Sequence, residues 1–335
     1  MSRETVEMHN VAEPIPADDG VRLDRLPPEV TEPFNDRSQE EYRRPDGVEL
    51  RFVGESAEIT LSCPEGSCEA TPFWGPFQHR PEEHVTLDAE PTTIELSLPE
   101  RVETVDRDRL DDRYFDPTVG RLVLFGNPVV LHDVSGDVRL PDPAERPDGT
   151  LLTYGTSITQ GACASRYPMT YGHQTARLLG DDHLNLGSGG SAFCENALAE
   201  YIAGRDDWDR AVLAVSVNMI AAGFDAEEFG ERVRYLVDTV AGSHPDKPVA
   251  AVTLFPFFAD LCPEITDGDE WPATPSQYRE EVRDAVAAAD RDNLHLIEGS
   301  DLLQDPGGLS TDLLHPMDHG MTEIAHRLAD RLREL

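Results

Sequence analysis

A serine stands at the point where an apolar segment of the chain ends. Residues 151–155, LLTYG, run directly into Thr156, Ser157 and Ile158. A serine hydroxyl is a poor nucleophile until a base removes its proton, so a catalytic role for Ser157 requires an acid–base partner elsewhere in the chain. The alternative is that Ser157 only caps a helix, since capping and nucleophilic serines occupy the same location.

A histidine that could act as this base lies near the C-terminus, in the segment TDLLHP at 311–316. Asp312 precedes His315 by three residues, a spacing at which a turn can bring the carboxylate to the ring Nδ1. A carboxylate in that position fixes the tautomer of the imidazole and stabilises the imidazolium. We therefore predict that Ser157, His315 and Asp312 act as nucleophile, base and acid. A plain surface turn is the alternative for this segment, and Asp301 is a rival acid.

Two further segments could stabilise the oxyanion of an acyl-transfer reaction. NLGSGGS at 185–191 is glycine-rich, and Asn218 follows the apolar run AVLAVSV at 211–217. The backbone N–H of Ser157, a glycine N–H of the second segment and the side-chain amide of Asn218 would together supply three donors. Removing one such donor typically lowers the rate by about 10²–10³. The alternatives are a flexible loop for the glycine-rich segment and a strand-end turn for Asn218.

The pattern around these residues predicts a parallel sheet with helices on both faces. After Thr150, apolar runs of strand length alternate with segments of helical periodicity. Sites in such sheets form beyond the carboxyl ends of the strands, which is where the candidate residues lie. The predicted strands cover 151–155, 183–187, 211–217, 249–255 and 293–299, and the predicted helices cover 168–179 and 194–204 and include 229–240, 278–289 and 324–332.

The first part of the chain has a different hydrophobic pattern. Short segments of alternating polarity, separated by Gly, Pro and Asp, predict an all-β sandwich or jelly roll. They cover 48–54, 57–63, 92–99, 120–126, 129–136 and 137–141. An arm precedes them up to about residue 45, and the proline-rich 141–150 reads as a linker. We expect an N-terminal domain over 1–145 and a second domain over 150–335. Phe73, Trp74 and Phe77 are expected to pack in the first domain, with sugar stacking as the alternative.

Four segments of the second domain resemble the sequence blocks of the SGNH, or GDSL-type, hydrolase family. They are GTSIT at 155–159, NLGSGG at 185–190, SVN at 216–218 and DLLHP at 312–316, in the family's order. The resemblance implies a flavodoxin-like sheet, Ser157, Asp312 and His315 as a triad, and an oxyanion hole formed by Ser157, Gly190 and Asn218. Thr156 and Ser216 replace the family's usual aspartate and glycine. With its aspartate-free first block and its NLGxGG form, the chain is similar to a two-domain subgroup that carries an N-terminal β-sandwich and includes esterases and acyltransferases.

These observations predict a serine esterase that hydrolyses short-chain acyl esters of a small or sugar-like alcohol through an acyl-enzyme. The loop 256–275, with Phe257, Phe258 and Trp271, could wall the acyl pocket. An acyltransferase with an alcohol acceptor and a non-catalytic carbohydrate-binding protein are the alternatives. HExxH, paired CxxC and phosphate-loop motifs do not occur, so neither a metal site nor a cofactor is expected.

The charge balance excludes several partners. Asp and Glu number 65 against 28 Lys and Arg, for a formal net charge of -37, and Lys247 is the single lysine. Self-repulsion of this size is screened in molar salt, where the Debye length is about 3 Å. The composition is typical of haloarchaeal proteins, with an acidic mesophilic protein as the alternative. Without a basic patch, neither nucleic acid nor an anionic membrane is an expected partner.

The remaining expectations concern location and assembly. The N-terminus does not have the pattern of a signal peptide, and the apolar run 211–224 is too short to span a bilayer. The five cysteines are an odd number, which argues against a complete disulfide framework. We expect a cytoplasmic protein whose partner is a small-molecule ester. A homodimer is one alternative for its oligomeric state.

Overall fold

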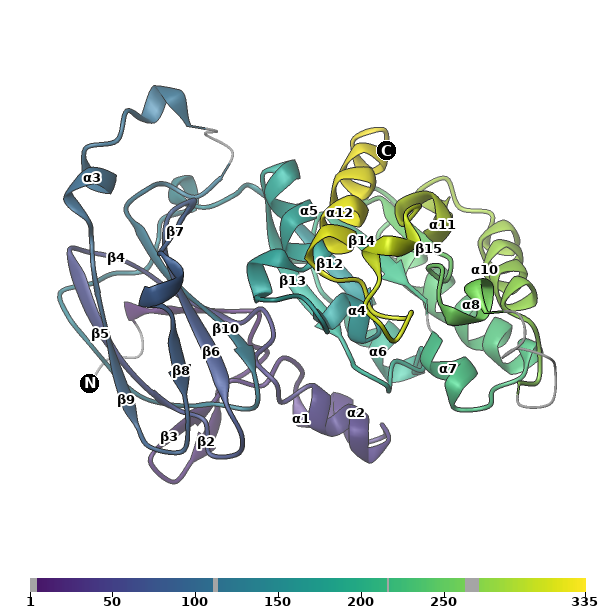
Figure 1. Ribbon diagram of the computed structural model, residues 1–335, viewed down its shortest axis with the longest axis horizontal. Coiled ribbons are helices and arrows are strands. Elements are labelled where there is room, and N and C mark those ends of the chain that lie inside the picture. Colours follow the sequence, from purple (N-terminus) through teal and green to yellow (C-terminus); the bar gives the residue numbers. More distant parts are fainter. Residues whose placement is uncertain (1–4, 111–113, 216, 263–270) are drawn as a thin grey trace. The chain divides into compact units, whose positions relative to one another are not determined.

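The chain forms two compact units (Figure 1). The structure, a computed structural model, describes residues 5–110, 114–215, 217–262 and 271–335. The first, or sandwich, unit comprises Met1–Pro27, Tyr42–Gly149 and Gly180–Asp182. The second, or α/β, unit comprises Pro28–Glu41, Thr150–Leu179 and His183–Leu335. Residues 28–41, which by sequence belong to the N-terminal arm, therefore lie with the α/β unit.

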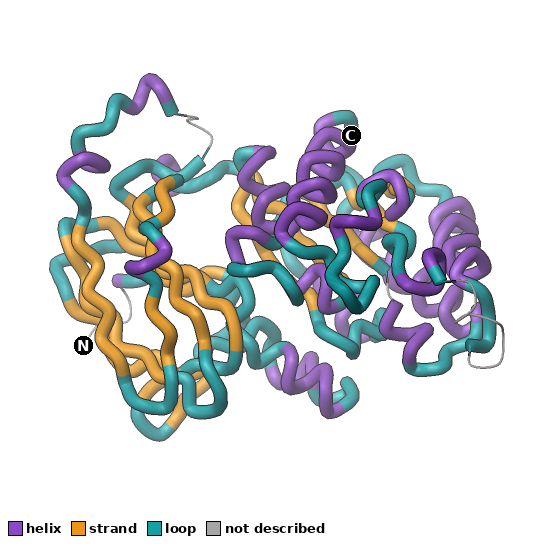
Figure 2. Tube along the Cα trace, viewed as in Figure 1, coloured by secondary structure: helices purple, strands orange, loops and turns teal. Residues whose placement is uncertain are grey.

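Two sheets form the sandwich unit (Figure 2), and the strand pairs within them are antiparallel. Large side chains from both sheets, among them Phe52 and Ile59, share one buried core. The first sheet has the order β1 (Glu7–His9), β4 (Glu49–Val53), β10 (Val119–Gly126), β6 (Cys68–Trp74) and β7 (Phe77–Gln78), with β8 (Val85–Leu87) also paired to β6. The second has the order β2 (Ile15–Ala17), β3 (Gly20–Arg22), β11 (Val130–Ser135), β5 (Ser56–Ser62) and β9 (Thr92–Ser97).

Some strands of this unit differ from the sequence prediction. Strand β6 was not predicted, because Pro72 interrupts its pattern and proline argues against a strand interior. The predicted strand at 137–141 is wrong, since only Arg139 of this segment pairs, in an isolated bridge with Val53. Phe73 and Trp74 are almost completely buried in β6, as expected for packing residues, and this burial excludes sugar stacking on their rings.

The α/β unit contains the predicted sheet. Its order is β13 (Asp181–Gly187), β12 (Gly149–Gly155), β14 (Arg210–Ala214), β15 (Val249–Val252) and β16 (Leu294–Ile297). The pairs β12–β14, β14–β15 and β15–β16 are parallel. In order of sequence this is 2-1-3-4-5, the order of flavodoxin-like folds, whose ligands bind where the strand order reverses. That point lies at β12, the strand that leads to Ser157.

The helices of the α/β unit pack in two groups (Figure 1). One group, α5 (Tyr171–Leu179) and α12 (Asp318–Arg333), covers the apolar side chains of Leu151, Val212 and Ala250. The other comprises α6 (Asn196–Ala203), α8 (Ala226–Ser243) and α10 (Pro275–Ala289). Shorter helices are α1 (Pro28–Thr31), α2 (Asp36–Glu41), α4 (Ser157–Gln160), α7 (Val217–Ala221), α9 (Phe258–Leu261) and α11 (Gly299–Leu302).

The prediction for the third strand of this sheet was too long. Strand β14 ends at Ala214, and the buried helix α7 begins at Val217. The apolar run 211–217 therefore continues from a strand into a helix, and a short apolar run does not distinguish the two by periodicity. As a result, Asn218 lies in the first turn of a helix and not at the end of a strand.

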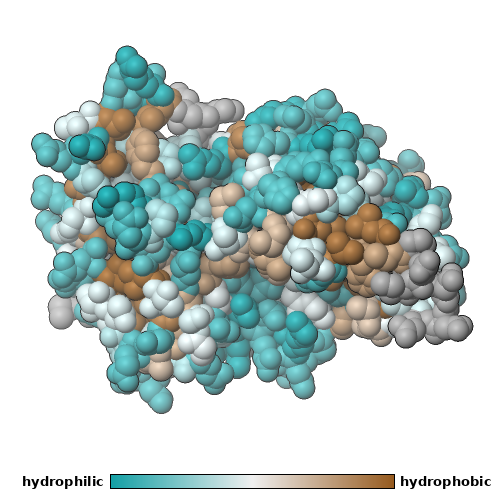
Figure 3. Space-filling model, in the orientation of Figure 1, coloured by the Kyte–Doolittle hydropathy of each residue, from teal (hydrophilic) through white to brown (hydrophobic). Residues whose placement is uncertain are grey.

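Hydrophilic residues cover most of the face shown in Figure 3. This agrees with a composition in which Asp and Glu outnumber Lys and Arg by 65 to 28. In the part of the chain that the structure describes, no helix is both long enough and apolar enough to cross a membrane.

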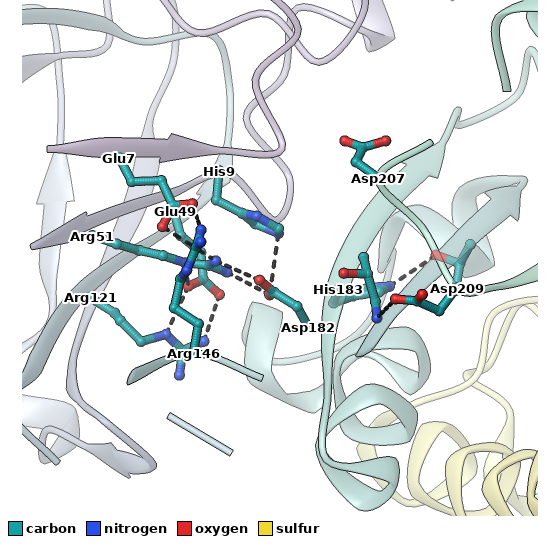
Figure 4. A network of polar contacts seen from close by, with 12 residues as sticks. Glu7, His9, Glu49, Arg51, Arg121, Arg146, Asp182, His183, Asp207 and Asp209 are labelled. Carbon is teal, nitrogen blue, oxygen red and sulfur yellow. Dashed lines mark hydrogen bonds and ion pairs between the residues drawn. The ribbon is translucent and has the colours of Figure 1, made fainter. Parts of the chain in front are cut away.

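A cluster of charged side chains is buried inside the sandwich unit (Figure 4). Arg51 donates two hydrogen bonds of 2.6 Å to Asp182 and one of 2.8 Å to Glu49. Arg121 binds the same Glu49 carboxylate through bonds of 2.7 and 2.8 Å. Both guanidinium groups are essentially inaccessible to water. Removing one member of such a cluster leaves an unpaired buried charge, which typically costs about 3–5 kcal/mol.

Candidate active site

Ser157 lies at the sharp turn between β12 and α4. Thr156 is the N-cap of α4, and its side chain accepts a hydrogen bond from the N–H of Ile158. The N–H groups of a first helical turn have no partners within the helix, so Ser157 presents its N–H and its hydroxyl at the same end of α4. The side chain of Ser157 is half-buried, and it follows a strand whose last five residues are buried.

The structure brings His315 and Asp312 to this serine. Ser157 Oγ lies 2.8 Å from His315 Nε2, although the residues are 158 positions apart. On the other side of the ring, His315 Nδ1 lies 2.7 Å from Asp312 Oδ2. A carboxylate accepts only, so Nδ1 carries the proton and Nε2 is left to accept one from the serine. Asp301, the rival acid, lies elsewhere on α11, where it pairs with Arg331.

Asp312 is held in a tight turn. Its Oδ1 accepts hydrogen bonds from the Ser310 hydroxyl at 2.6 Å and from the N–H groups of Leu314 and His315 at 2.8 and 3.0 Å. Leu313, between them, has φ 52°, a left-handed conformation that costs an L-residue about 1–2 kcal/mol. This strained turn places the carboxylate of Asp312 within hydrogen-bond distance of backbone N–H groups of the same turn and beside the imidazole.

This environment keeps Asp312 ionised. Partial burial alone would raise the pKa of Asp312, but hydrogen bonds from Ser310, His315 and the backbone outweigh it and hold that pKa well below its usual range. An ionised Asp312 can stabilise a positive charge on His315. The arrangement is therefore able to take a proton from Ser157 and return it to a leaving group.

The glycine-rich segment contacts the serine from the second strand end. A methyl group added at Gly189 would lie 3.6 Å from Ser157 Cβ. Gly187 crosses the backbone of Gln160 so closely that any side chain at this position would collide with it. Gly190 has φ 69°, and a methyl group there would lie 2.5 Å from Arg37 Cζ. The first two segments of the predicted site are thus joined in space.

Asn218 reaches the same segment from α7. Its Oδ1 accepts a hydrogen bond from the N–H of Ala192 at 3.3 Å, which orients the amide. The side chain is 8 % exposed. Asn218, Gly190 and Ser157 therefore lie in the segments that follow strands β14, β13 and β12, beyond one edge of the sheet.

Helix α2 also contributes to the site, which the sequence did not indicate. Arg37 Nε donates a hydrogen bond of 2.8 Å to the carbonyl oxygen of Gly189. Glu41 accepts one of 2.8 Å from Gln160, the last residue of α4. The helix thus braces both the glycine-rich segment and the helix that begins at Ser157. No local motif in 28–41 signals this role, because the contacts span more than 110 positions.

A small apolar cavity adjoins the serine. Its volume is about 20 Å³, and its walls include Thr156 and Ile158, on either side of Ser157, and Leu314, next to His315. Apolar residues from two other segments complete it, namely Ala214, Val215, Val217, Leu254, Phe255 and Phe257. Trp271 stacks on Phe257 with ring centroids 5.8 Å apart, while residues 263–270 of the predicted pocket wall lie outside the described residues.

All five cysteines are free thiols in the structure. Cys63 and Cys68 are buried in the sandwich unit, and burial raises the pKa of both. Cys194 is buried and Cys262 half-buried. Cys163, in contrast, is exposed. It lies three residues after the end of α4, beside the Asp312 and His315 side chains.

Comparison with known proteins agrees with this architecture. A family model described as GDSL-like Lipase/Acylhydrolase family matches residues 149–333. A search of curated proteins found no match.

Several solved structures share the fold over almost their whole length. A salicylyl-acyltransferase from a tetracycline biosynthetic pathway has a TM-score of 0.75 and 16% identity, covering 98% of this chain and 95% of that one. A family two carbohydrate esterase from Cellvibrio japonicus has a TM-score of 0.64 and 16% identity, covering 99% and 96%. An acetyl xylan esterase from Butyrivibrio proteoclasticus has a TM-score of 0.58 and 12% identity, covering 100% and 96%.

At identities this low, these likenesses concern the fold. The family match rests on the sequence itself, and it covers more than half of the chain, including every residue of the Ser157, His315 and Asp312 cluster. The chain belongs to the GDSL-like lipase/acylhydrolase family.

Proposed function

We propose that the protein is a serine esterase that removes a short acyl group, best an acetyl group, from a small or sugar-like alcohol. The observation that carries the proposal is the continuous chain of contacts from Ser157 Oγ to His315 Nε2 at 2.8 Å and from His315 Nδ1 to Asp312 at 2.7 Å. Nucleophile, base and orienting carboxylate in this order are the requirement for acyl transfer through a covalent intermediate.

The reaction would proceed in two halves. Ser157 Oγ attacks the ester carbonyl carbon while its proton passes to His315 Nε2, and Asp312 stabilises the resulting imidazolium. Donors from Ser157 N–H, Gly190 N–H and the Asn218 amide would bind the oxyanion of the tetrahedral intermediate. Collapse of this intermediate breaks the bond to the alcohol, which leaves with the proton from His315. Water then repeats the sequence on the acyl-enzyme and releases the carboxylic acid and the free serine.

The cavity beside Ser157 argues for a short acyl group. One water molecule needs about 10–15 Å³ of such volume, so a cavity of about 20 Å³ suits a group as small as a methyl. Its walls are apolar, which suits the methyl group of an acetyl ester. The printed names of two neighbours in the fold, a carbohydrate esterase and an acetyl xylan esterase, are consistent with a sugar alcohol.

The exposure of the site supports water as the acyl acceptor. The side chain of His315 is 20% exposed and that of Asp312 is 47% exposed. A transferase must keep water away from its acyl-enzyme, whereas these residues are open to it. Acyl transfer to an alcohol remains the second candidate, because a neighbour in the fold carries the name of an acyltransferase.

Hydrolysis of p-nitrophenyl acetate, butyrate and octanoate in molar KCl tests the proposal. We expect kcat/KM to be highest for acetate, activity to be absent in Ser157→Ala, and activity to persist in Ser243→Ala, a surface control on α8. A fluorophosphonate should label Ser157 in the wild-type protein. A carbohydrate-binding protein without catalysis would show neither activity nor labelling, and a transferase would form new esters when an alcohol is added.

A further inference from the structure

We propose that Cys163, Asp312 and His315 form a binding site for a thiophilic divalent cation such as Zn²⁺, and that the bound cation switches the esterase off. Each residue offers one ligand atom, a thiol sulfur, a carboxylate oxygen and a ring nitrogen, and these atoms lie within 4.8 Å of one another. No role in acyl transfer requires a thiol at this place.

The backbone holds Cys163 in position for this site. Gly161 ends α4 in a left-handed conformation, and the N–H of Ala162 bonds back to the carbonyl oxygen of Ser157 at 2.8 Å. Cys163 itself has φ 67°, a conformation unfavourable for an L-residue. A turn held by these bonds places the thiol on the exposed side of the two triad residues, where a cation from solution can reach it.

The ligand set matches zinc chemistry. Zn²⁺ binds thiolate sulfur at about 2.3 Å and imidazole nitrogen or carboxylate oxygen at about 2.0–2.2 Å, with four ligands in a tetrahedron. Three protein ligands and one water would complete the shell. Ligands at these distances in a tetrahedron lie about 3.4–3.6 Å apart. The His315 Nδ1 and Asp312 Oδ2 atoms, now 2.7 Å apart, would have to open slightly, and the Cys163 sulfur, at most 4.8 Å from them, would have to move closer.

Binding would disable the base through its tautomer. In the metal-free site Nδ1 carries the ring proton, and Nε2 accepts the proton of Ser157. Zn²⁺ on Nδ1 replaces that proton, which moves to Nε2, while the Cys163 thiol gives its proton to water. One proton is released for each cation bound, and the ring stays neutral. An Nε2 that already carries a proton cannot accept one from Ser157, so the acylation step stops.

Inhibition by buffered free Zn²⁺ tests the site, with p-nitrophenyl acetate as substrate and a chloride-free salt as medium. Each variant is compared with its own activity in the presence of EDTA. We expect wild type to be inhibited at micromolar Zn²⁺ and restored by EDTA. Cys163→Ser should need at least about tenfold more Zn²⁺, because even the loss of a group that only orients a metal ligand typically costs about 10–100-fold in affinity. Cys262→Ser, which alters the other accessible thiol, should behave as wild type.

A measurement that does not depend on activity separates this proposal from the esterase assignment. Cd²⁺ bound to a thiolate gives an ultraviolet charge-transfer band. The band should form with one equivalent of Cd²⁺ in wild type, in Ser157→Ala and in Cys262→Ser, and should be missing in Cys163→Ser. Equal Zn²⁺ sensitivity of Cys163→Ser and wild type, or a band that survives in Cys163→Ser, would overturn the proposal.

Discussion

The carboxylate of Asp312 holds the ring of His315 at 2.7 Å from within the same four-residue turn. The other oxygen of the carboxylate is bound by the N–H groups of Leu314 and His315. The orientation of the imidazole is therefore determined by local backbone, and it does not depend on an acid from another loop.

The first prediction concerns this carboxylate. In Asp312→Asn the amide can donate to Nδ1, which favours the tautomer with the proton on Nε2. We expect kcat for p-nitrophenyl acetate to fall by about 10³–10⁴ with little change in KM. Asp301→Asn, on α11, is the matched control and should retain wild-type kcat. A smaller loss in Asp312→Asn than in Asp301→Asn would reverse the assignment of the acid.

The strain at Leu313 leads to the second prediction. A β-branched residue tolerates φ near 52° poorly, whereas glycine adopts it freely. Leu313→Val should lower the free energy of unfolding by about 1–2 kcal/mol and reduce kcat, because the turn that holds Asp312 is distorted. Leu313→Gly should retain kcat. Urea unfolding and steady-state kinetics of the two variants test this explanation. An equal loss of activity in Leu313→Val and Leu313→Gly would contradict it.

The sheet could be predicted from sequence because its strands are continuous apolar runs followed by turn residues. The strand order and the helices on both faces agree with the expected flavodoxin-like fold. The strand of 211–217 was misjudged at its end, since periodicity does not separate a buried strand from the buried helix α7. Strand β6 could not be predicted, because Pro72 interrupts its sequence pattern.

In the candidate site, contacts between residues close in sequence could be predicted, and contacts between distant residues could not. Asp312 and His315 are three residues apart, and their turn could be predicted from that spacing. Arg37 could not be predicted, because its hydrogen bond to Gly189 joins residues 152 positions apart and neither residue type is distinctive. Gly190 was assigned only through the family resemblance, because the Arg37 side chain that fills the space beside it comes from a distant part of the chain.

A third prediction tests the glycine-rich segment. Gly190→Ala adds a methyl group 2.5 Å from Arg37 Cζ at a residue with φ 69°. It should displace the proposed oxyanion donor and lower kcat by about 10²–10³ while leaving the protein folded. Gly223→Ala is a matched control, since φ is 85° there but nothing lies within 4 Å of the added atom. Similar kcat in the two variants would mean that backbone strain alone, and not the oxyanion donor, had been altered.

The fourth prediction concerns acid stability of the sandwich unit. Burial alone would raise the pKa of Asp182, but Arg51 and His9 outweigh it and lower that pKa to about 2. Because the folded pKa lies below the unfolded value of about 4, the carboxylate stabilises the fold above pH 4, and this contribution is lost as the pH falls toward 2. The urea midpoint should therefore decline steeply over this interval.

Asp182→Asn checks the origin of that decline. The variant should be less stable at pH 7 by about 3–5 kcal/mol, since Arg51 loses a buried partner, and its stability should vary less between pH 4 and 2. Asp133→Asn, an exposed position on β11, should follow the wild-type curve. An unchanged slope in Asp182→Asn would show that other carboxylates cause the acid sensitivity.

The fifth prediction follows from the net charge of -37. Raising KCl from 0.1 to 2 M shortens the Debye length from about 10 Å to less than 3 Å and should weaken the repulsion among surface carboxylates. We expect Tm to increase by at least about 10 °C, equivalent to several kcal/mol for a chain of this size. A Tm that is constant in differential scanning calorimetry over this range would contradict a haloarchaeal type of adaptation.

The path of the backbone restricts how this protein can be shortened. Helix α2 is made from residues 36–41, yet it belongs to the α/β unit, and the chain then returns to complete the sandwich unit. A fragment starting at residue 150 would therefore match the family and contain Ser157, Asp312 and His315, but would lack the guanidinium of Arg37 and the carboxylate of Glu41. Any minimal enzyme derived from this protein has to restore 28–41, either by a graft onto the new N-terminus or as a separate peptide.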